Sequence, residues 1–263
     1  MTPLFEFEAG TEPLLISIPH AGTDLTPGLA ARLTPTARAL PDTDWFVDRL
    51  YTVARELGAS ILKANYARVV VDLNRPADGA SLYPGQRETG LCPVINFDGT
   101  PLYLPGAEPD AAECANRLTT YWQPYHDKIA ETLAGLKASH GRAILWDAHS
   151  IRSEVPGLFE GRLPDFNLGT GNGSSCPQAL AARLLAVAQS AKGYSAVLNG
   201  RFKGGHITRH YGQPESGIIA VQLELAQSTY MTETAPHDWL DDRAKTTQSV
   251  IRRLLETVLK SGL

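Results

Sequence analysis

Short apolar runs alternate with longer segments of helical periodicity, and this alternation constrains the fold of the chain more than any other feature of its sequence. Alternating strands and helices indicate an α/β protein in which helices pack on a central, largely parallel or mixed sheet. We find no internal repeat. The runs that read as strands are 13–19, 60–63, 69–73, 143–146, 195–198 and 218–225, and the helical segments are 45–57, 111–138, 177–191 and 239–259.

The size and composition of the chain are those of an ordinary globular protein. With 263 residues, 43% of them hydrophobic and 20% charged, it can bury the core of one large domain or of two closely joined ones. Two segments rich in proline and glycine, 76–109 and 156–177, interrupt the alternation. Irregular loops of this length in a compact domain usually cover or form a binding site. We therefore expect both segments to be active-site loops.

Charge and cysteine content exclude several classes of protein. The formal net charge is −4 and no run of Lys or Arg exceeds two residues, so we expect no nucleic-acid partner. The N-terminal MTPLFEFEAG lacks the features of a signal peptide, and no apolar stretch is long enough to cross a bilayer. Cys92, Cys114 and Cys176 are odd in number and widely spaced, which fits reduced thiols. We expect a cytoplasmic protein without membrane contact.

Two common catalytic signatures are missing. The cluster GTGNGSS at 169–175 lacks the GxxxxGK[ST] pattern, and Ser174 stands where GxGxxG requires glycine. No GxSxG nucleophile motif occurs. We therefore interpret 169–175 as a loop and predict neither phosphate-loop nor serine-hydrolase chemistry.

The stretch AILWDAHS at 143–150 places two polar residues at the end of an apolar strand. Asp147 and His149 are two residues apart, so on a strand they share one face. In open α/β sheets the ends of strands are where ligands bind. Taken alone, His149 fits three interpretations: a core histidine whose hydrogen bonds are satisfied, a catalytic base or a metal ligand. The residues at the other strand ends are needed to distinguish between them.

Other strand ends also carry polar side chains. A glutamate inside an apolar strand is costly unless it has a partner, which makes Glu224 of GIIAVQLELAQ notable. Carboxylates around the start of a helix also suit the helix dipole, so some of those in LPDTDWFVDRLY are expected to be caps only. The polar residues at these ends are His20 in SIPHAG, Asp42, Asp44 and Asp48 in LPDTDWFVDRLY, Asp72, Asn74 and Arg75 in RVVVDLNRP, and Gln222 and Glu224.

Together these residue types point to metal-dependent hydrolysis. Two histidines and one carboxylate are the ligands of a catalytic zinc site whose fourth position holds water. A separate glutamate then takes a proton from that water. An arginine fork matches the two oxygens of a substrate carboxylate. The sequence predicts an amidohydrolase that acts on a small acid.

Six motifs in this order closely resemble the N-formylglutamate amidohydrolase (deformylase) family: SIPHAG, DTDWFVDRLY, VVVDLNRP, LWDAHS, GRFKGGHITRHYG and VQLELAQSTYM. The resemblance runs from about Leu14 to Met231 and implies a single family domain over 1–263. It implies a three-layer α/β/α fold of the phosphorylase/hydrolase-like type, with a mixed sheet and one zinc ion. The related aspartoacylases and zinc carboxypeptidases share this fold. It also implies hydrolysis of N-formyl-L-glutamate by water to formate and L-glutamate, the last step of one route of histidine degradation.

The resemblance makes His20 and His149 the imidazole ligands of the zinc. In the carboxypeptidases an acid lies three residues after the first histidine, but here that residue is Thr23. The carboxylate ligand must come from elsewhere, and the resemblance favours Asp44, with Asp42 and Asp48 as alternatives. Asp147 is expected to orient an imidazole.

The resemblance also implies roles for Glu224, Asn74, Arg75 and Arg68. Glu224 matches the general acid/base, the Asn74–Arg75 pair matches the group that holds the substrate carboxylate, and Arg68 lies near the place of a carbonyl-polarising arginine.

A dicarboxylate should need a second arginine, for which Arg209 is favoured over Gln86 and Arg87. His206 and His210 are expected to support the site or face the substrate, while His126, His140 and His237 are expected at the surface.

Two alternatives stay open at this point. A zinc deacylase of another N-acyl amino acid would have the same metal ligands and differ only in its acyl pocket. A carboxylate-binding module without catalysis would keep the arginines but would not need Glu224 beside two histidines.

Overall fold

The structure is a computed structural model that describes residues 2–82, 85 and 87–261. Seven strands form one mixed sheet in the order β1-β3-β2-β4-β7-β5-β6. The central strands β2, β4 and β7 run parallel, whereas β1 is antiparallel to β3 and β5 is antiparallel to β7. The strands are β1 (Phe5–Glu8), β2 (Leu14–Ile18), β3 (Ser60–Ala64), β4 (Ala143–Ile151), β5 (Phe166–Gly169), β6 (Ala196–Leu198) and β7 (Ile218–Ala226).

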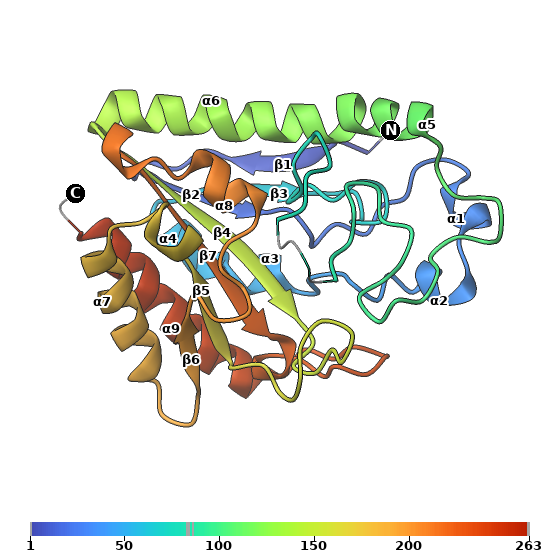
Figure 1. Ribbon diagram of the computed structural model, residues 1–263. Helices are drawn as coiled ribbons and strands as arrows, with labels where there is room; N and C mark the ends of the chain where they lie inside the picture. The colour runs from blue at the N-terminus through green and yellow to red at the C-terminus, as the bar shows by residue number, and fades with distance from the viewer. Residues whose placement is uncertain (1, 83–84, 86, 262–263) are drawn as a thin grey trace.

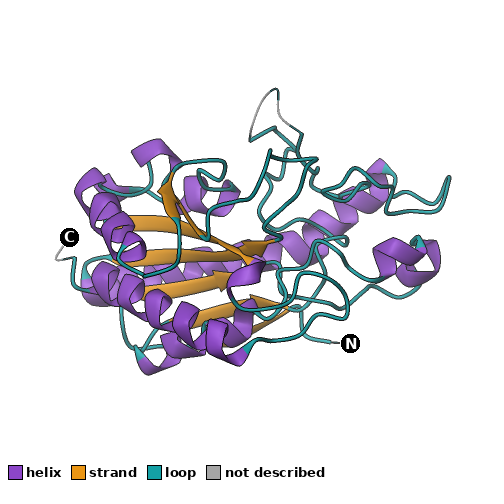
Figure 2. Cartoon of the chain, turned by 90° about the horizontal axis from the view of Figure 1, so that it is seen from below, coloured by secondary structure: helices purple, strands orange, loops and turns teal. Residues whose placement is uncertain are grey.

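Helices cover both faces of the sheet and give the three layers that the family resemblance implies (Figure 1). One face carries the long helix α6 together with α8, and the opposite face carries α7 and α9. Irregular loops gather beyond one end of the strands (Figure 2). The helices are α1 (Leu29–Arg32), α2 (Pro35–Arg38), α3 (Val47–Leu50), α4 (Thr52–Glu56), α5 (Ala111–Arg117), α6 (Gln123–His140), α7 (Gln178–Gln189), α8 (His206–Tyr211) and α9 (Asp241–Leu259).

The central strand β4 is buried on both faces and divides its side chains between two cores. Ile144, Trp146 and Ala148 belong to the core under α7 and α9, while Leu145 belongs to the core under α6. Because side chains alternate along a strand, Asp147 and His149 lie on the same face as Leu145. Strand β7 alternates in the same way, with Ala220 in the core under α6 and Val221 in the other. The face under α6 and α8 therefore turns from apolar to polar toward the carboxyl ends of the strands.

Residues 69–73, which we predicted to be a strand, do not form one. The segment is buried, but it follows a turn, and a distant side chain bonds its backbone. Arg117 Nη1 donates to the carbonyl oxygens of Val69 and Val70 at 3.1 and 2.9 Å. Buried carbonyl groups need hydrogen-bond donors, and here a side chain supplies them in place of a neighbouring strand.

Other boundaries also differ from the sequence-based expectations. The predicted helix 45–57 is two short helices separated at Tyr51, whereas 111–138 is continuous because a π-helical turn, Leu118–Trp122, joins α5 to α6. Strand β5 lies inside a segment that we expected to be a loop, and neither β1 nor α8 was predicted.

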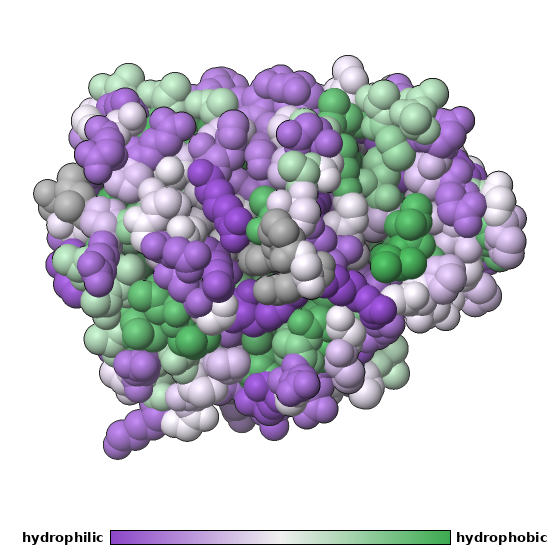
Figure 3. Space-filling model, viewed as in Figure 1, coloured by the Kyte–Doolittle hydropathy of each residue, from purple (hydrophilic) through white to green (hydrophobic). Residues whose placement is uncertain are grey.

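In the part of the chain that the structure describes, no helix is both long and apolar enough to span a membrane. Hydrophilic side chains occupy much of the face shown in Figure 3, with smaller apolar areas between them.

His126 is buried, so its prediction as a surface residue is wrong. Its ring stacks on Trp122 with ring centroids 3.6 Å apart. Nε2 lies 2.8 Å from the carbonyl oxygen of Leu73, and Nδ1 lies 3.0 Å from the hydroxyl of Tyr211. Burial lowers the pKa of His126 to about 3, because the imidazolium form is poorly solvated there.

This lowered pKa predicts a loss of stability in acid. Between pH 6.5 and 3 the unfolded chain binds a proton at His126 that the folded chain does not, so the free energy of unfolding decreases as the pH decreases. His126→Gln removes this titration. We expect wild type to be more stable than His126→Gln at pH 7.5, and the difference to shrink by about 2 kcal/mol at pH 5. Urea unfolding at both pH values measures it.

The control is His140→Gln, at the exposed last residue of α6, which should leave the stability at pH 7.5 within about 0.5 kcal/mol of wild type. A stability difference between wild type and His126→Gln that stays constant from pH 7.5 to 5 would contradict the assignment of a neutral, buried imidazole.

Candidate active site

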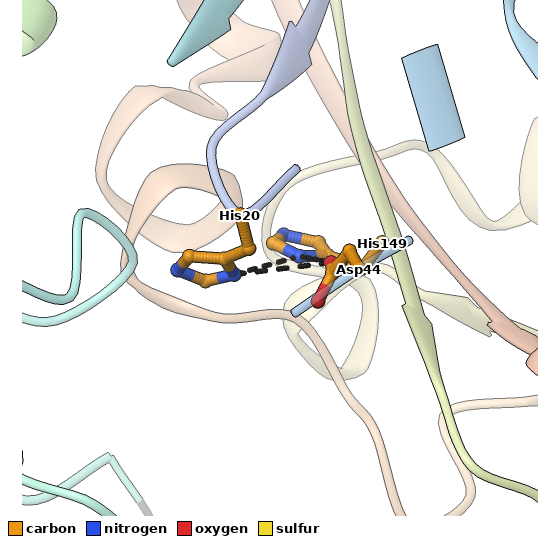
Figure 4. Close-up of side chains that lie close together, drawn as sticks. All are labelled: His20, Asp44 and His149. Atoms are coloured by element: carbon orange, nitrogen blue, oxygen red, sulfur yellow. Dashed lines mark hydrogen bonds and ion pairs between the residues drawn. The ribbon is translucent and has the colours of Figure 1, made fainter. Parts of the chain in front are cut away.

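Three residues that are distant in sequence meet where β2 and β4 end (Figure 4). His20 follows β2, His149 lies near the end of β4, and Asp44 immediately precedes the segment that leads into α3. His20 Nδ1 lies 3.2 Å from His149 Nδ1, while Asp44 Oδ2 lies 3.1 Å from His149 Nδ1 and 3.9 Å from His20 Nδ1. All three side chains are buried, and they form the group among the described residues that could hold a metal ion.

A second carboxylate stands behind each imidazole. Asp72 Oδ1 lies 2.8 Å from His20 Nε2, and Asp147 Oδ1 lies 3.1 Å from His149 Nε2, although the latter pair is not aligned as a hydrogen bond. Metal-binding histidines usually face such a group with their second nitrogen, because it sets the ring orientation and the tautomer. Nδ1 of each ring therefore faces the cluster.

The donor set and its spacing fit a divalent transition metal. Two imidazole nitrogens and one carboxylate oxygen are the protein ligands of many catalytic zinc sites. Bonds of about 2.0–2.2 Å in a tetrahedral arrangement separate ligand atoms by about 3.3–3.6 Å. The three observed separations, between 3.1 and 3.9 Å, are close to that range.

The other two carboxylates that the sequence left open lie elsewhere. Asp42 Oδ2 accepts a hydrogen bond from the backbone nitrogen of Phe97 at 3.0 Å. Asp48 is half exposed and lies 3.7 Å from Lys63 Nζ. Of the three candidates, Asp44 is the one that the fold brings to His20 and His149.

Charge in the cluster is arranged around Arg68. Its Nη2 lies 2.7 Å from His20 Nδ1 and 3.2 Å from Asp44 Oδ1, and Nη1 donates to Asp72 Oδ2 at 3.1 Å. Burial and the positive charge of Arg68 lower the pKa of His20 to about 4. Burial also opposes a charge on His149, but Asp147 and Asp44 outweigh it and raise the pKa of this imidazole well above its usual value. The buried carboxylates thus favour a positive charge on His149, whereas burial and Arg68 disfavour one on His20.

Glu224 lies next to the cluster on the neighbouring strand. In the register of β4 and β7 it is opposite His149, and Gln222 is opposite Asp147. The Glu224 carboxyl is buried and accepts a hydrogen bond from Gln222 Nε2 at 3.2 Å. Burial, with smaller contributions from Asp44 and Asp147, raises the pKa of Glu224 to about 8. A carboxyl group with such a pKa can exchange a proton near neutral pH.

The side chain of Asn74 contacts both His149 of the cluster and the first turn of α8. Its Nδ2 lies 2.9 Å from His149 Nε2 and 3.3 Å from Asp147 Oδ2, and its Oδ1 accepts from the backbone nitrogen of Ile207 at 2.8 Å. Residue 205 must be glycine for this approach, because a β-carbon there would lie within 2.4–2.6 Å of the Asn74 amide. Asn74 is therefore held firmly beside His149.

These residues border a cavity whose empty volume, including the open solvent at its mouth, is about 600 Å³. His20, His149 and Glu224 lie on its wall, together with Asn74, Arg75 and Arg68. Both segments that we expected to be active-site loops contribute to the wall, through Arg87, Thr89 and Phe97 from 76–109 and through Leu158 from 156–177.

The remaining candidates have different positions. Arg209 lies off the described wall of the cavity and donates to the carbonyl oxygens of Gly204 and Leu82. His206 and His210 stack on each other with ring centroids 5.0 Å apart, also off that wall. Gln86 is outside the described residues. Their predicted roles stay predictions.

Sequence reasoning missed two residues of this site. Asp72 was noted at the end of an apolar run but given no role, although the signal was its place two residues before the Asn-Arg pair. Arg201 lies on the cavity wall and precedes the Phe-Lys-Gly-Gly stretch, where nothing in the local pattern distinguishes it from a surface arginine.

Comparison with known proteins identifies the family of this chain. The family model described as N-formylglutamate amidohydrolase matches residues 12–231. The chain belongs to this family.

Curated relatives match over the whole chain. An N-formylglutamate deformylase of Pseudomonas aeruginosa is 61% identical over 262 residues, covering 100% of this chain and 98% of that protein. One of Pseudomonas putida is 53% identical with the same coverage.

Two solved structures share the fold. The crystal structure of N-formylglutamate amidohydrolase from Ralstonia eutropha JMP134 has a TM-score of 0.81 at 24% identity, covering 98% of this chain and 99% of that one. The crystal structure of an Agrobacterium tumefaciens gene product has a TM-score of 0.75 at 20% identity, covering 99% and 96%. The α/β fold with a mixed central sheet, predicted from the sequence, is confirmed.

Proposed function

We propose that this chain is a zinc-dependent N-formylglutamate deformylase, which hydrolyses N-formyl-L-glutamate to formate and L-glutamate and completes a route of histidine degradation. The observation that carries the proposal is the buried cluster of His20, Asp44 and His149 with Glu224 beside it on one cavity wall. The names of the two relatives that match the whole chain support the choice of substrate.

The proposed metal ligands are His20, His149 and Asp44, with Asp72 and Asp147 orienting the two imidazoles. A zinc ion held there supplies a Lewis acid for the formyl carbonyl and for the attacking water. The chain contributes the rest of the chemistry. Arg68 lies beside His20 and Asp44, where its guanidinium can also stabilise negative charge on the carbonyl oxygen.

Glu224 is the proposed proton carrier. It accepts a proton from the attacking water and delivers it to the nitrogen of the departing glutamate. Its raised pKa suits both steps, because the group can hold a proton near neutral pH and release it again. Arg75 is proposed to bind the substrate carboxylate. Thr89 positions its guanidinium, accepting from Nε at 2.7 Å through its carbonyl and from Nη2 at 3.3 Å through its hydroxyl.

The metal assignment predicts zinc content. His20→Ala and His149→Ala should each lose tight zinc binding and activity, because two protein ligands hold the ion poorly. Asp44→Asn should bind zinc less tightly than wild type. Asp42→Asn and Asp48→Asn are matched controls that should keep it. Elemental analysis of the purified proteins, with circular dichroism to verify folding, measures the effect. Equal zinc in wild type and both histidine variants would remove the proposed centre.

The proton carrier predicts a rate effect without loss of metal. Glu224→Gln keeps the shape of the side chain but cannot accept a proton, so kcat should decrease at least about a hundredfold while zinc content and melting temperature are retained. Glu215→Gln, exposed in the turn before β7, is the control and should turn over at the wild-type rate. A folded, zinc-replete Glu224→Gln within a few fold of wild type would leave the base unidentified.

The alternative, a zinc deacylase with a larger acyl group, depends on what closes the acyl side of the cavity. Phe97 lies on the cavity wall, and the Arg68 guanidinium lies 5.0 Å from the centre of its ring. Because Arg68 contacts Asp44, Phe97 is close to the proposed metal centre. A buried phenylalanine ring at this point favours the formyl group, which is the smallest acyl group.

A substrate panel tests this choice. Wild type should hydrolyse N-formylglutamate far faster than the N-acetyl and N-succinyl analogues. Phe97→Ala should raise the acetyl-to-formyl ratio of kcat/KM about tenfold or more, since one methyl group is worth 10–200-fold in a tight pocket. Phe159→Ala, which removes a neighbouring ring off the cavity wall, is the control. Preference of the wild type for a larger acyl group would favour the alternative.

A further inference from the structure

The cavity has more positive charge than one carboxylate requires. Four arginines lie on its wall: Arg68, Arg75, Arg87 and Arg201. Two of them lie next to the buried carboxylate of Asp72. Arg68 Nη1 donates to Asp72 Oδ2, and Arg75 Nη1 lies 3.9 Å from the same oxygen. The other two come from separate loops, and the reaction proposed above assigns neither of them a role.

Arg87 and Arg201 converge on the short segment Gly157–Leu158. Arg201 Nε donates to the carbonyl oxygen of Leu158 at 2.9 Å. A β-carbon on Gly157 would lie 3.1 Å from Arg87 Nη1, so the absence of a side chain there allows this guanidinium to approach. Two guanidinium groups held near one backbone segment on a cavity wall make a favourable place for an anion.

Arg201 and Arg75 approach the cavity from different parts of the sheet. Arg75 Nη1 lies 3.9 Å from Asp72 Oδ2, and Asp72 contacts His20, so Arg75 lies near the proposed metal centre. Arg201 follows β6, the edge strand, which β7 and β5 separate from β4. A substrate whose amide lies at His149 and Glu224 would therefore meet Arg75 near its reacting end and Arg201 further along.

A formylated amino acid with an acidic side chain has its two carboxylates in this relation. One is on the carbon that bears the scissile amide, and the other is at the end of the side chain. Building on the proposed function, we infer that Arg201, with Arg87 beside it, binds the side-chain carboxylate, while Arg75 binds the α-carboxylate. Arg201 thus takes the role that the sequence assigned to Arg209, which is not among the residues described on the cavity wall.

A matched pair of substrates tests the inference. N-formyl-L-glutamine has the size of N-formyl-L-glutamate but no charge on its side chain. Arg201→Gln should reduce kcat/KM for N-formylglutamate by about ten- to a hundredfold, the effect of losing hydrogen bonds to a charged group. It should leave the much lower kcat/KM for N-formylglutamine nearly unchanged, so the preference for the acid collapses. Arg75→Lys should reduce kcat/KM for both substrates, because both contain the α-carboxylate.

Two further variants separate this role from others. Arg183→Gln, exposed on α7, is the control for loss of an arginine and should keep the wild-type preference. Arg201→Lys keeps the charge and should recover part of the preference. An equal loss on both substrates in Arg201→Gln would mean that Arg201 only holds Leu158 in place, and would overturn the inference.

Collapse of the preference in Arg209→Gln but not in Arg201→Gln would also overturn it, and would restore the assignment made from the sequence. If Arg201→Gln has the wild-type kcat/KM for both substrates, Arg201 does not bind the side-chain carboxylate, and the inference is again overturned. If the wild-type enzyme hydrolyses neither substrate, the proposed function fails instead, because the inference concerns only how the acid is distinguished from the amide.

Discussion

The geometry of the site depends on one fully buried carboxylate, that of Asp72. It lies 2.8 Å from His20 Nε2, accepts from the backbone nitrogen of Asn74 at 2.9 Å and accepts from Arg68 at 3.1 Å. Burial opposes its ionisation, but Arg75, His20 and Arg68 outweigh this effect and hold the pKa of Asp72 well below its usual value. A buried charge is stable only with such partners, so the same contacts that satisfy Asp72 also orient His20 and the loop that carries Asn74 and Arg75.

The parallel pairing of β4 with β7 supplies the second constraint. It places Asp147 opposite Gln222 and His149 opposite Glu224 on one face of the sheet. A slip of β7 by one residue would turn Gln222 and Glu224 toward the apolar core under α7 and α9. The register is fixed by the large side chains on that other face, Trp146 among them, whose indole nitrogen donates to Tyr51 at 2.7 Å. Packing on one side of the sheet thus secures the polar arrangement on the other.

Positive charge is distributed along the cavity rather than concentrated at the cluster of His20, Asp44 and His149. Arg68 and Arg75 are close to the carboxylate of Asp72, whereas Arg87 and Arg201 meet at Gly157–Leu158. A substrate with two negative charges would be oriented by this separation, because each carboxylate has its own guanidinium partners. Orientation matters for hydrolysis, since a bound amide reacts only when its carbonyl faces the nucleophile and the proton carrier.

The sequence by itself determined the α/β class, the central strands, and the presence of His20, His149 and Glu224 at strand ends, because strand periodicity and burial are local properties of a chain. It left three aspartates within seven residues open, and only the folded backbone brought Asp44 rather than Asp42 or Asp48 to the imidazoles. Residues 69–73 look like a strand locally, but Arg117 supplies their backbone partners from more than forty residues away. His126 looks like a surface residue, but Trp122, Leu73 and Tyr211 enclose it. The positions of Asp72 beside His20 and of Arg201 on the cavity wall likewise depend on contacts between distant segments. Tertiary structure decided these positions, because a local pattern does not specify which distant group will satisfy a buried charge or border a cavity.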